Sequence, residues 1–477
     1  MAKTSILTII LSFGFLAAQA QTEWTLQKCI DHAFQNNIQI QQSQLNLELS
    51  EISKQQSVGT MLPSVNASAS HGYNWGQTID PFTNSFATER IQSNSFGIST
   101  GMTIFNGFQT LNRYKQGDIN IEQGKADLQK MKNDIALNVA NAFLNVLFNQ
   151  EFLNIARFNF ESSDEQVKRV QQLVEAGAAP EGNLMEIKAQ NASDKAAVVN
   201  AENNLNIAKL NLTQLLRLQG AEAQNFSIVS PESIEPDAGS LAASAAQAVQ
   251  NAVSTFPEIK SAQAGVIAAE QGLAISKGGM SPRLAVSFSY GTGYSGANNV
   301  PVGELTYQGD QPIGLVQNTN DIVIAPVFGY DDFETKPFGD QLGDNINSSL
   351  FFQLSVPIFN GFNTKTNIAQ SKVQQLQATY ALEQVEQQLS QDVERAYADA
   401  LAAYNNYLAA EASVEATTLA FEYAQVQYEA GVINAVDYTN SRIRRDNAQA
   451  DLIRNKYDYI FRTKVLDFYQ GKALSFK

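Results

Sequence analysis

Only one cysteine and two histidines occur among the 477 residues of the chain. A single cysteine excludes an internal disulfide framework and any zinc cluster built on cysteine pairs. Two histidines argue against a multi-histidine metal centre. Charged residues make up 17% of the chain, against about 25% in ordinary soluble proteins. We therefore expect no metal, no cofactor and no enzymatic activity.

Basic residues are scarce relative to acidic ones. The sequence has 32 Lys and Arg against 47 Asp and Glu, which gives a net charge of −15. Nucleic-acid binding requires clustered basic side chains at the phosphates, so we expect no nucleic-acid partner. Hydrophobic residues make up 44% and aromatic residues 9% of the chain, which excludes a disordered acidic protein.

The one long apolar stretch lies at the N-terminus. Lys3 is followed by the apolar segment Ile6 to Leu16 and by the small-x-small site Ala18-Gln19-Ala20. This pattern is typical of a secretory signal peptide, here residues 1–20. It is too short for a membrane-spanning helix, which needs about 20 apolar residues. We expect a mature chain outside the cytoplasm that could reside in a membrane only through a closed β-barrel.

The mature sequence is internally duplicated. Residues 104–108 (IFNGF) recur at 358–362, an offset of 254 residues. Further upstream the offset is 219 residues, and Met61-Leu62-Pro63 corresponds to Met280-Ser281-Pro282. The two offsets differ by 35 residues, which indicates one insertion between Pro282 and Ile358.

Four segments alternate apolar residues with small or hydroxyl-bearing ones. They cover residues 64–75, 93–105, 284–292 and 346–357, and none contains a charged residue. Uncharged strands of about this length are typical of transmembrane barrels. The alternative is half of a soluble β-sandwich, although exposed sandwich faces usually carry Lys and Glu.

Four strands are too few to close a barrel, because the smallest known membrane barrels have about eight. An open sheet in lipid would leave backbone groups unpaired, at a cost of several kcal/mol each. If these strands span a membrane, several copies must share one barrel. The strand count alone does not choose between two, three and four copies.

The remaining segments predict long helices. Residues 109–176 contain no proline, and apolar or small residues recur there with the 4-3 spacing of a coiled coil. The same pattern recurs 254 residues later. Turns at 176–182 and 430–435 precede return helices at 184–218 and 436–470. Each repeat therefore ends in a helical hairpin, over 109–218 and 363–470.

The sequence divides into a signal peptide, two repeats and their connections. We assign residues 21–219 to the first repeat, 220–240 to a linker, 241–470 to the second repeat and 471–477 to a C-terminal tail. The stretch 295–345 contains eight acidic residues and one basic residue, Lys336. It is predicted to be a long outer loop, and the simplest reading of its charge is a solvated segment.

The order and doubling of these elements, and the opening segment 24–37 (WTLQKCIDHAFQNN), resemble the TolC-type outer-membrane efflux proteins. The resemblance implies a homotrimer whose 12 strands form one barrel in outer-membrane lipid and whose helices form a periplasmic tunnel. It also implies a periplasmic adaptor protein and an inner-membrane transporter as partners, in a Gram-negative bacterium. The expected function is a passive exit duct for efflux or type I secretion. The alternative is a secreted or periplasmic coiled-coil structural or adhesion protein.

The hairpin tips carry the candidate site residues. In the family the second tip resembles Tyr-x-x-Gly followed by two acids, and Gly431 here precedes one acid and one amide. Gly177 is the tip glycine of the first hairpin. The candidates for a periplasmic constriction are Tyr428, Asp437, Asn440, Asn183 and Glu186. Three copies of Asp437 would form a carboxylate ring that favours cations. The equally simple interpretation is a helix N-terminal acid that complements the macrodipole.

Other conspicuous residues have structural interpretations. Gly107 and Gly361 are predicted to permit the bend between strand and helix, because glycine tolerates unusual backbone angles. Cys29 and His32 share a helical face, but core packing is a simpler explanation than a metal site. Tyr73 and Trp75 are typical of the aromatic girdle of a membrane barrel.

Overall fold

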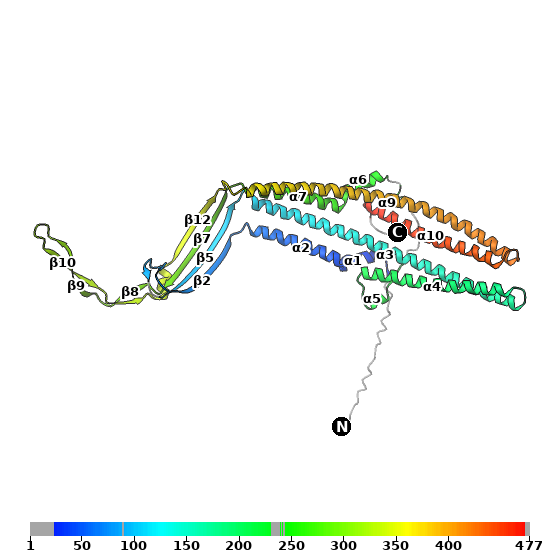
Figure 1. Cartoon of the computed structure of the whole chain (residues 1–477), viewed down its shortest axis with the longest axis horizontal. Coiled ribbons are helices and arrows are strands. Elements are labelled where there is room, and N and C mark those ends of the chain that lie inside the picture. Colours follow the sequence, from blue (N-terminus) through cyan, green and yellow to red (C-terminus); the bar gives the residue numbers. More distant parts are fainter. Residues whose placement is uncertain (1–22, 88–89, 230–238, 240, 242–243, 473–477) are drawn as a thin grey trace, which may run out of the picture. The chain divides into compact units, whose positions relative to one another are not determined.

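The computed structural model describes residues 23–87, 90–229, 239, 241 and 244–472 (Figure 1). The predicted signal peptide lies outside these residues, as do parts of the predicted linker 220–240 and tail 471–477. The chain forms two compact units. One comprises residues 1–50, 120–266 and 377–477, and the other comprises residues 51–119 and 267–376. Each sequence repeat contributes to both units.

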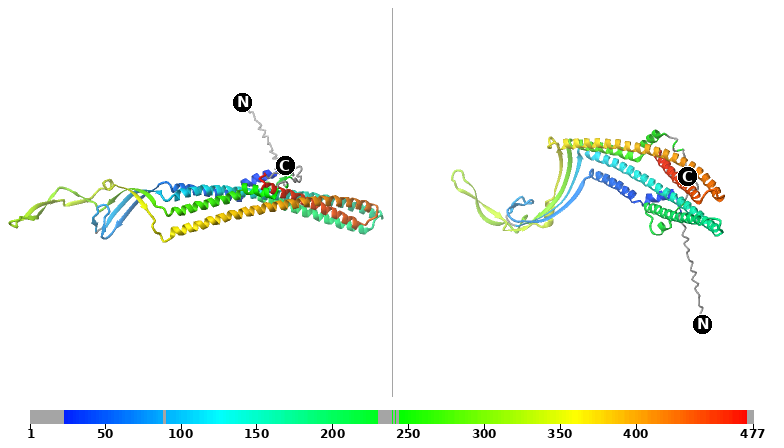
Figure 2. Two further views of the ribbon diagram at one scale, coloured as in Figure 1. Left: turned by 90° about the horizontal axis from the view of Figure 1, so that it is seen from above. Right: turned by 45° about the vertical axis from the view of Figure 1, so that its right-hand side comes forward.

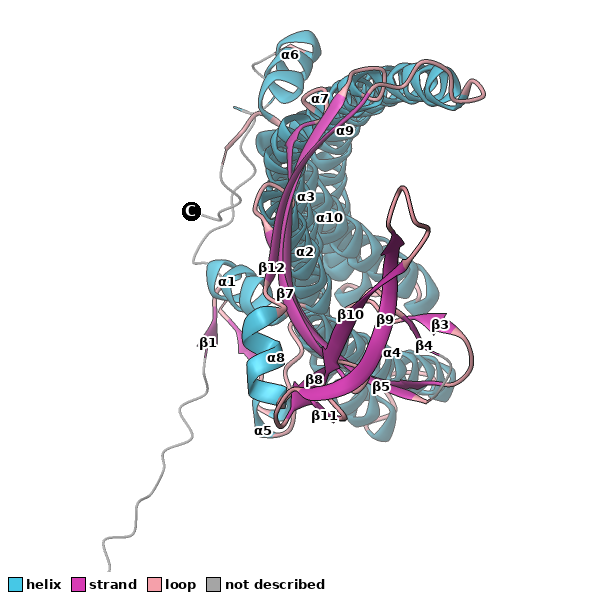
Figure 3. Ribbon diagram, turned by 90° about the vertical axis from the view of Figure 1, so that its left-hand side faces the viewer, coloured by secondary structure: helices cyan, strands magenta, loops and turns pink. Residues whose placement is uncertain are grey.

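The smaller unit contains a four-stranded antiparallel sheet with the order β12-β7-β5-β2. Figure 1 shows the four strands side by side, and Figure 3 shows the curvature of β7 and β12. The strands are β2 (Ser64–Asn74), β5 (Ile91–Phe105), β7 (Arg283–Ser295) and β12 (Asn347–Ser355). Their positions agree with the four alternating segments to within three residues. The last strand stops before Pro357, because proline has no N–H group for the ladder.

Both faces of this sheet are exposed within one chain, and the apolar face is extensive. Val65, Phe352 and Leu354 are 69%, 66% and 65% exposed. Tyr73 and Trp75 lie near each other at one end of β2, with ring centroids 6.1 Å apart. The exposed apolar face is consistent with contact with lipid.

The segment beyond β7 contains ordered strand pairs. The strands β8 (Asn299–Val302) and β11 (Asp332–Thr335) pair with each other, and so do β9 (Thr306–Leu315) and β10 (Ile322–Gly329). A short helix, α8 (Phe338–Asp344), leads back to β12. The loop after β2 contains the small pair β3 (Thr78–Ile79) and β4 (Phe86–Ala87). The sequence pattern predicts only a long acidic loop over 295–345, because the irregular register of these pairs hides the alternation of a strand.

Buried polar groups hold these outer segments to the sheet. The hydroxyl of Ser295 donates a hydrogen bond to the carboxylate of Asp80, and Asp80 is 1% exposed. The other Asp80 oxygen accepts from the N–H groups of Phe82 (2.9 Å) and Thr83 (2.8 Å). The amide of Gln341 donates to the carbonyl of Ser295 at 3.0 Å. Both connections at this end are therefore fixed to β7.

The larger unit is helical and contains the apolar core. Its two hairpins are formed by α3 (Gln109–Glu175) with α4 (Glu181–Leu215), and by α9 (Asn363–Glu429) with α10 (Ala435–Tyr469) (Figure 2). Most of the 4-3 positions predicted from sequence are buried, including Val139, Leu153, Val393 and Ala400, and the others are half-buried. The return helix α4 begins directly after Pro180, three residues before the predicted start.

Shorter elements complete the fold. They are β1 (Glu23–Trp24), paired in parallel with β6 (Ser227–Ile228), and the helices α1 (Leu26–Asn36), α2 (Ile38–Gly59), α5 (Ala221–Gln224), α6 (Ala245–Thr255) and α7 (Pro257–Gly278). No helix of the described chain is long and apolar enough to cross a membrane.

Cys29 is a core residue. It is fully buried on α1, and burial raises the pKa of its thiol to about 12. His32 packs edge-on against Trp24, with ring centroids 5.1 Å apart. Within the residues that the structure describes, no group of three His, Cys, Asp or Glu side chains could hold a metal ion.

Candidate functional site

The two hairpin tips have the same backbone geometry. Gly177 and Gly431 adopt left-handed angles, with φ of 72° and 71°. The N–H of Gly431 donates to the carbonyl of Tyr428 at 3.0 Å, and the N–H of Val432 donates to that of Gln427 at 2.9 Å. This pair of bonds is the Schellman motif, which ends helices at a glycine. Corresponding bonds occur at the first tip, so both glycines are required by the turn itself.

Asp437 and Asn440 lie on one exposed face of α10, at its start. Asp437 is in the first turn, and its N–H donates to the side chain of the N-cap residue Asn434 at 2.9 Å. The intervening residues Tyr438 and Thr439 are buried, whereas Asp437 and Asn440 are exposed. Residues three apart are neighbours on a helix surface. Asp437 is thus a helix N-terminal acid on an exposed face. Its geometry fits both a residue of the constriction and an acid that complements the helix macrodipole.

Tyr428 lies between the two hairpins. Its ring stacks on that of Tyr438 with centroids 4.9 Å apart. Burial and, secondarily, the charge of Glu186 raise the pKa of the Tyr428 hydroxyl. Glu186 and Asn183 are half-buried in the first two turns of α4. The structure therefore brings Tyr428 and Glu186 together, whereas no hydrogen bond or ion pair joins Asp437 to them among the described residues.

A buried charged cluster that the sequence did not reveal joins the two hairpins. Arg442 of α10 is 2% exposed and forms an ion pair with Asp194 of α4. Its guanidinium also donates to the carbonyl of Asn159 on α3 at 3.4 Å and to Asp446 at 3.5 Å. A buried guanidinium needs several acceptors, and three elements supply them here. Coiled-coil spacing within one hairpin gives no signal for contacts between hairpins, which is why sequence reasoning missed this cluster.

Further contacts extend the same junction. The amide of Gln166 on α3 donates a hydrogen bond to the hydroxyl of Tyr438. The guanidinium of Arg445 lies 4.2 Å from the ring centroid of Phe421, a cation–π arrangement. The first turns of α10 are therefore attached to both α3 and α9.

The strand-to-helix bends form the second set of candidate residues. Gly107 and Gly361 have φ of 66° and 63°. The following residues, Phe108 and Phe362, also have positive φ, of 62° and 64°. The sequence indicated the glycines but gave no signal for the phenylalanines. Two successive left-handed residues therefore form the bend between strand and helix (Figure 1).

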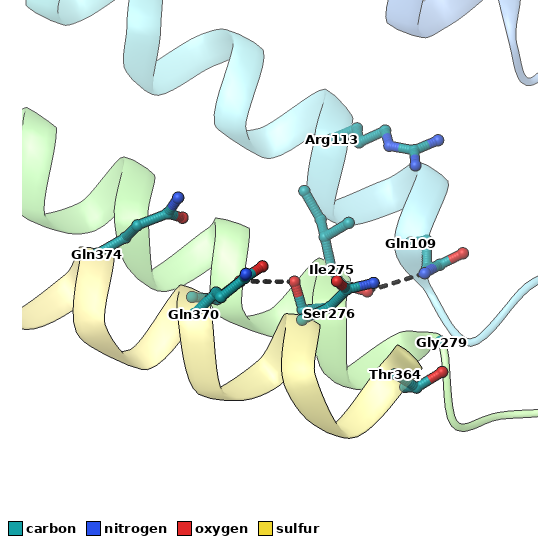
Figure 4. A pocket seen from close by; sticks show the side chains of 10 residues that line it. Gln109, Arg113, Ile275, Ser276, Gly279, Thr364, Gln370 and Gln374 are labelled. Atoms are coloured by element: carbon teal, nitrogen blue, oxygen red, sulfur yellow. Dashed lines mark hydrogen bonds between the residues drawn. The ribbon is translucent and has the colours of Figure 1, made fainter. Parts of the chain in front are cut away.

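A polar pocket of about 360 Å³ lies beside one of these bends, between the starts of α3 and α9 and the end of α7 (Figure 4). The amide of Gln109 donates to the carbonyl of Ile275 at 2.9 Å, and the hydroxyls of Ser276 and Ser371 lie 2.7 Å apart. Arg113 is the one titratable residue among those that line it. Acid–base catalysis needs a positioned proton donor or acceptor, so this pocket offers polar contacts and no catalytic pair.

The chain is similar in sequence to proteins of efflux and secretion systems. The family model "Outer membrane efflux protein" matches residues 29–216 and 248–469. The outer membrane efflux protein BepC of Brucella suis is 21% identical over 463 residues, which cover 96% of this chain and 88% of BepC. The alkaline protease secretion protein AprF of Pseudomonas aeruginosa is 22% identical over 414 residues, or 86% of this chain and 77% of AprF.

Solved structures show the same fold. The structure of CusC matches with a TM-score of 0.76 and 14% identity, and covers 95% of this chain and 93% of CusC. The outer membrane protein VceC of Vibrio cholerae matches with a TM-score of 0.72 and 13% identity, covering 94% of this chain and 97% of VceC. At this identity the likeness concerns the fold.

Proposed function

Because the chain belongs to the outer membrane efflux protein family, we propose that three copies pool their strands into one 12-stranded barrel that serves as an exit duct. The family consists of outer-membrane channels and is not a class of enzymes. The chain is thus an outer-membrane exit duct of an efflux or secretion system, through which substrates pass without chemical change.

The proposal rests on the two edges and the exposed apolar face of the four-stranded sheet. Its two edge strands, β12 and β2, each pair with one neighbour among the described strands. The apolar face of the sheet is exposed and carries no charge along the four predicted strand segments. An unpaired edge in lipid costs several kcal/mol per backbone group. Copies that share strands remove these edges, and three copies supply 12 strands.

The helices support the second half of the proposal. Two long hairpins per chain would give six hairpins around a threefold axis, enough for a periplasmic tunnel below the barrel. We propose that a periplasmic adaptor protein docks on this tunnel and that an inner-membrane transporter supplies the energy.

Mass measurement of the purified protein tests the duct. We expect it to require detergent for extraction and to form particles with three times the protein mass of one chain. Size-exclusion chromatography with light scattering, which separates protein from detergent mass, provides the readout. A detergent-independent monomer would contradict the duct and favour the alternative of a secreted coiled-coil structural or adhesion protein.

We also propose that Asp437 lines the periplasmic constriction, with Asn440, Tyr428, Asn183 and Glu186 around it. Its carboxylate lies on an exposed face at the tip end of α10. A ring of three carboxylates attracts cations and disfavours anions. Asp437→Ala should raise the divalent-cation concentration needed for half-maximal block in planar bilayers by about tenfold.

Two variants sharpen this measurement. Asn440→Asp adds a second carboxylate on the same face, so it should strengthen block by divalent cations. Glu411→Ala removes an exposed acid from α9 at a distance from the hairpin tip and should leave block unchanged. Identical conductance and block for Asp437→Ala and the unaltered protein would refute the constriction and leave the duct itself intact.

A further inference from the structure

The two repeats pair their strands in the same register. Ser64 lies opposite Gly101 in the first repeat. The counterparts of these residues, Arg283 and Ser355, are displaced by 219 and 254 residues and lie opposite each other in the second repeat. Two hydrogen bonds between serine hydroxyls repeat in the same way, Ser70 with Ser95 (2.7 Å) and Ser289 with Ser349 (2.6 Å). Adding the two offsets to a residue pair of the first repeat therefore gives the corresponding residue pair of the second repeat.

Inside the chain, the repeats meet through a second contact, which joins β5 and its bend to β7 and the end of α7. Ser99 of β5 lies opposite Ser289 of β7. At the bend, a Cβ atom added to Gly107 would lie 2.4 Å from the carbonyl oxygen of Gly278 and 2.6 Å from the Cβ atom of Ser281. The bend thus packs directly against the end of the preceding helix, and no larger residue fits there.

Both sides of this contact have a counterpart in the other repeat, and these counterparts lie at the two edges of the sheet. The counterparts of β5 and β7 are β12 and β2, which are the edge strands of the sheet. A Cβ atom on Gly361 or on Gly59 would meet no atom of the chain within 4 Å. Edge side chains are also more exposed than their counterparts in the sheet: Leu350 is 58% exposed against 39% for Phe96.

We propose that neighbouring copies reproduce the β5–β7 contact, so that β12 of one copy pairs with β2 of the next in the register given by the offsets. We call this contact the seam. Gln353 of one copy lies opposite Ser70 of the next. Gly361 of the first copy packs against Gly59 and Leu62 of the next. The inference rests on the shared barrel proposed above and specifies how its copies join.

The chemistry of the strand faces supports this register. A shift by one residue would place the apolar face of β12 against the hydroxyl-bearing face of β2, because side chains alternate with a period of two. The register of the seam instead matches like with like. Its pairs, with the β12 residue first, are Leu350–Tyr73, Phe352–His71, Leu354–Ala69 and Val356–Ala67 on the apolar face, and Ser349–Asn74, Gln353–Ser70 and Ser355–Ser68 on the other.

Side-chain volume distinguishes this register from shifts of two residues. Phe351 is a large side chain on the otherwise small-residue face of β12, and it is 64% exposed. In the seam it lies opposite Gly72 of the next copy, where no side chain competes for space. Shifts of two residues would set it against Ser70 or Asn74. The glycine thus accommodates the one bulky residue on this face.

Cross-linking tests the register. A chain carrying Gln353→Cys and Ser70→Cys is oxidised in outer membranes and run on a non-reducing gel. We expect covalent dimers and trimers, because directly opposed residues meet the geometry of a disulfide. The matched controls pair Gln353→Cys with Ser68→Cys or with Gly72→Cys and should give about fivefold less product, since diagonal partners lie about 7–8 Å apart.

Two further controls fix the interpretation. The unaltered chain contains only the buried Cys29 and should give no cross-linked species. Ser99→Cys with Ser289→Cys reports the parent contact within one chain and should yield a product of monomer mass. Stronger cross-linking of either diagonal pair would overturn the register. Trimers that cross-link through none of the three pairs would overturn the seam but retain the shared barrel, and monomers in detergent would overturn both.

A substitution at Gly59 tests the bend contact independently. A Cβ atom on its counterpart Gly278 would lie 2.5 Å from the carbonyl oxygen of Gly107, so Gly59→Val should clash with Gly361 of the neighbouring copy. We expect the trimer to dissociate about tenfold more readily on dilution in detergent, with unchanged helical circular dichroism. Gly339→Val is the control, because Gly339 is also helical with open space around it. Equal dissociation of both variants would remove Gly59 from the seam.

Discussion

Arg442 is the largest side chain that is almost completely buried in the described chain. Its position is stable because α3, α4 and α10 each supply an acceptor for its guanidinium. Taking one partner away leaves the other charge buried and uncompensated, which costs more than the ion pair contributes relative to apolar residues of similar volume. Arg442 and Asp194 therefore hold the two hairpins together, because neither charge is stable in the interior without the other.

Arg442→Met should lower the free energy of unfolding by about 3–5 kcal/mol. Arg442→Met combined with Asp194→Leu should recover most of this loss, because neither charge then remains. Thermal and denaturant unfolding followed by circular dichroism provides the measurement. The control is Arg157→Met, because Arg157 and its partner Glu202 are 52% and 45% exposed and such pairs contribute about 0–1 kcal/mol. Similar losses for the two arginines would contradict the assignment.

Tyr469 should make the helical unit sensitive to alkali. Its ring stacks on Phe256 with centroids 5.4 Å apart. Burial, with the negative charges of Asp392, Glu258 and Asp134, raises the pKa of its hydroxyl from 10.0 to about 12. A raised pKa means that the folded state binds the proton more tightly than the unfolded state. The resulting stabilisation is complete below pH 10 and is lost as the pH rises towards 12.

Tyr469→Phe keeps the ring and removes the titration. The variant should therefore lose less stability than the unaltered protein between pH 10 and 12, in unfolding measured at a series of pH values. Tyr380→Phe, at a position 64% exposed, should leave the slope unchanged. Parallel pH profiles for Tyr469→Phe and the unaltered protein would show that Tyr469 does not contribute.

Single residues could be predicted from sequence where a turn requires one particular backbone conformation. The tip glycines Gly177 and Gly431 recur in the sequence at the offset of 254 residues, and the left-handed backbone of both turns explains why glycine stands there. Arg442 and Asp194 are 248 residues apart, and each resembles an ordinary surface charge in its own helix. Only the packing of one hairpin on the other makes them buried partners, and periodicity within a helix contains no information on that packing.

At the scale of elements, the outer strand pairs are the feature that a sequence pattern did not reveal. The pair β9–β10 has no third strand in the described chain and exposes Ile313, Leu315 and Ile324 by more than half. The register of β9 with β10 shifts twice, which interrupts the alternation that marks a regular strand. By contrast, the four strands of the sheet alternate cleanly and were located from sequence alone.

Deletion of residues 304–330 should leave the sheet intact. The deletion joins Gly303 to Asp331, and Gly303 already has a positive φ of 92°, which suits a two-residue hairpin turn between β8 and β11. We expect the yield of the proposed trimer and its thermal midpoint to change little. Deletion of 338–344 is the control and should be destabilising, because it removes the buried Gln341. Loss of trimer on deletion of 304–330 would show that β9–β10 takes part in assembly.

At the scale of the whole molecule, duplication was readable from sequence, whereas the compact units were not. The repeats are successive in the chain, but each compact unit combines segments from both. This happens because the long helices α3 and α9 begin in one unit and end in the other. Copy number is likewise absent from the sequence pattern, since four strands fit any ring with enough copies to close.

The directions of the strands have a consequence for the diameter of the proposed barrel. Successive strands of the sheet are all antiparallel, so β12 and β2 run in opposite directions and every added copy continues the same alternation. Backbone pairing is therefore equally complete in rings of different circumference. The diameter must be selected by the curvature of the sheet and the lateral packing of the helices. Changes in the lateral packing of the helices would therefore favour a ring with another number of copies, and the ladder pairing would be complete in that ring as well.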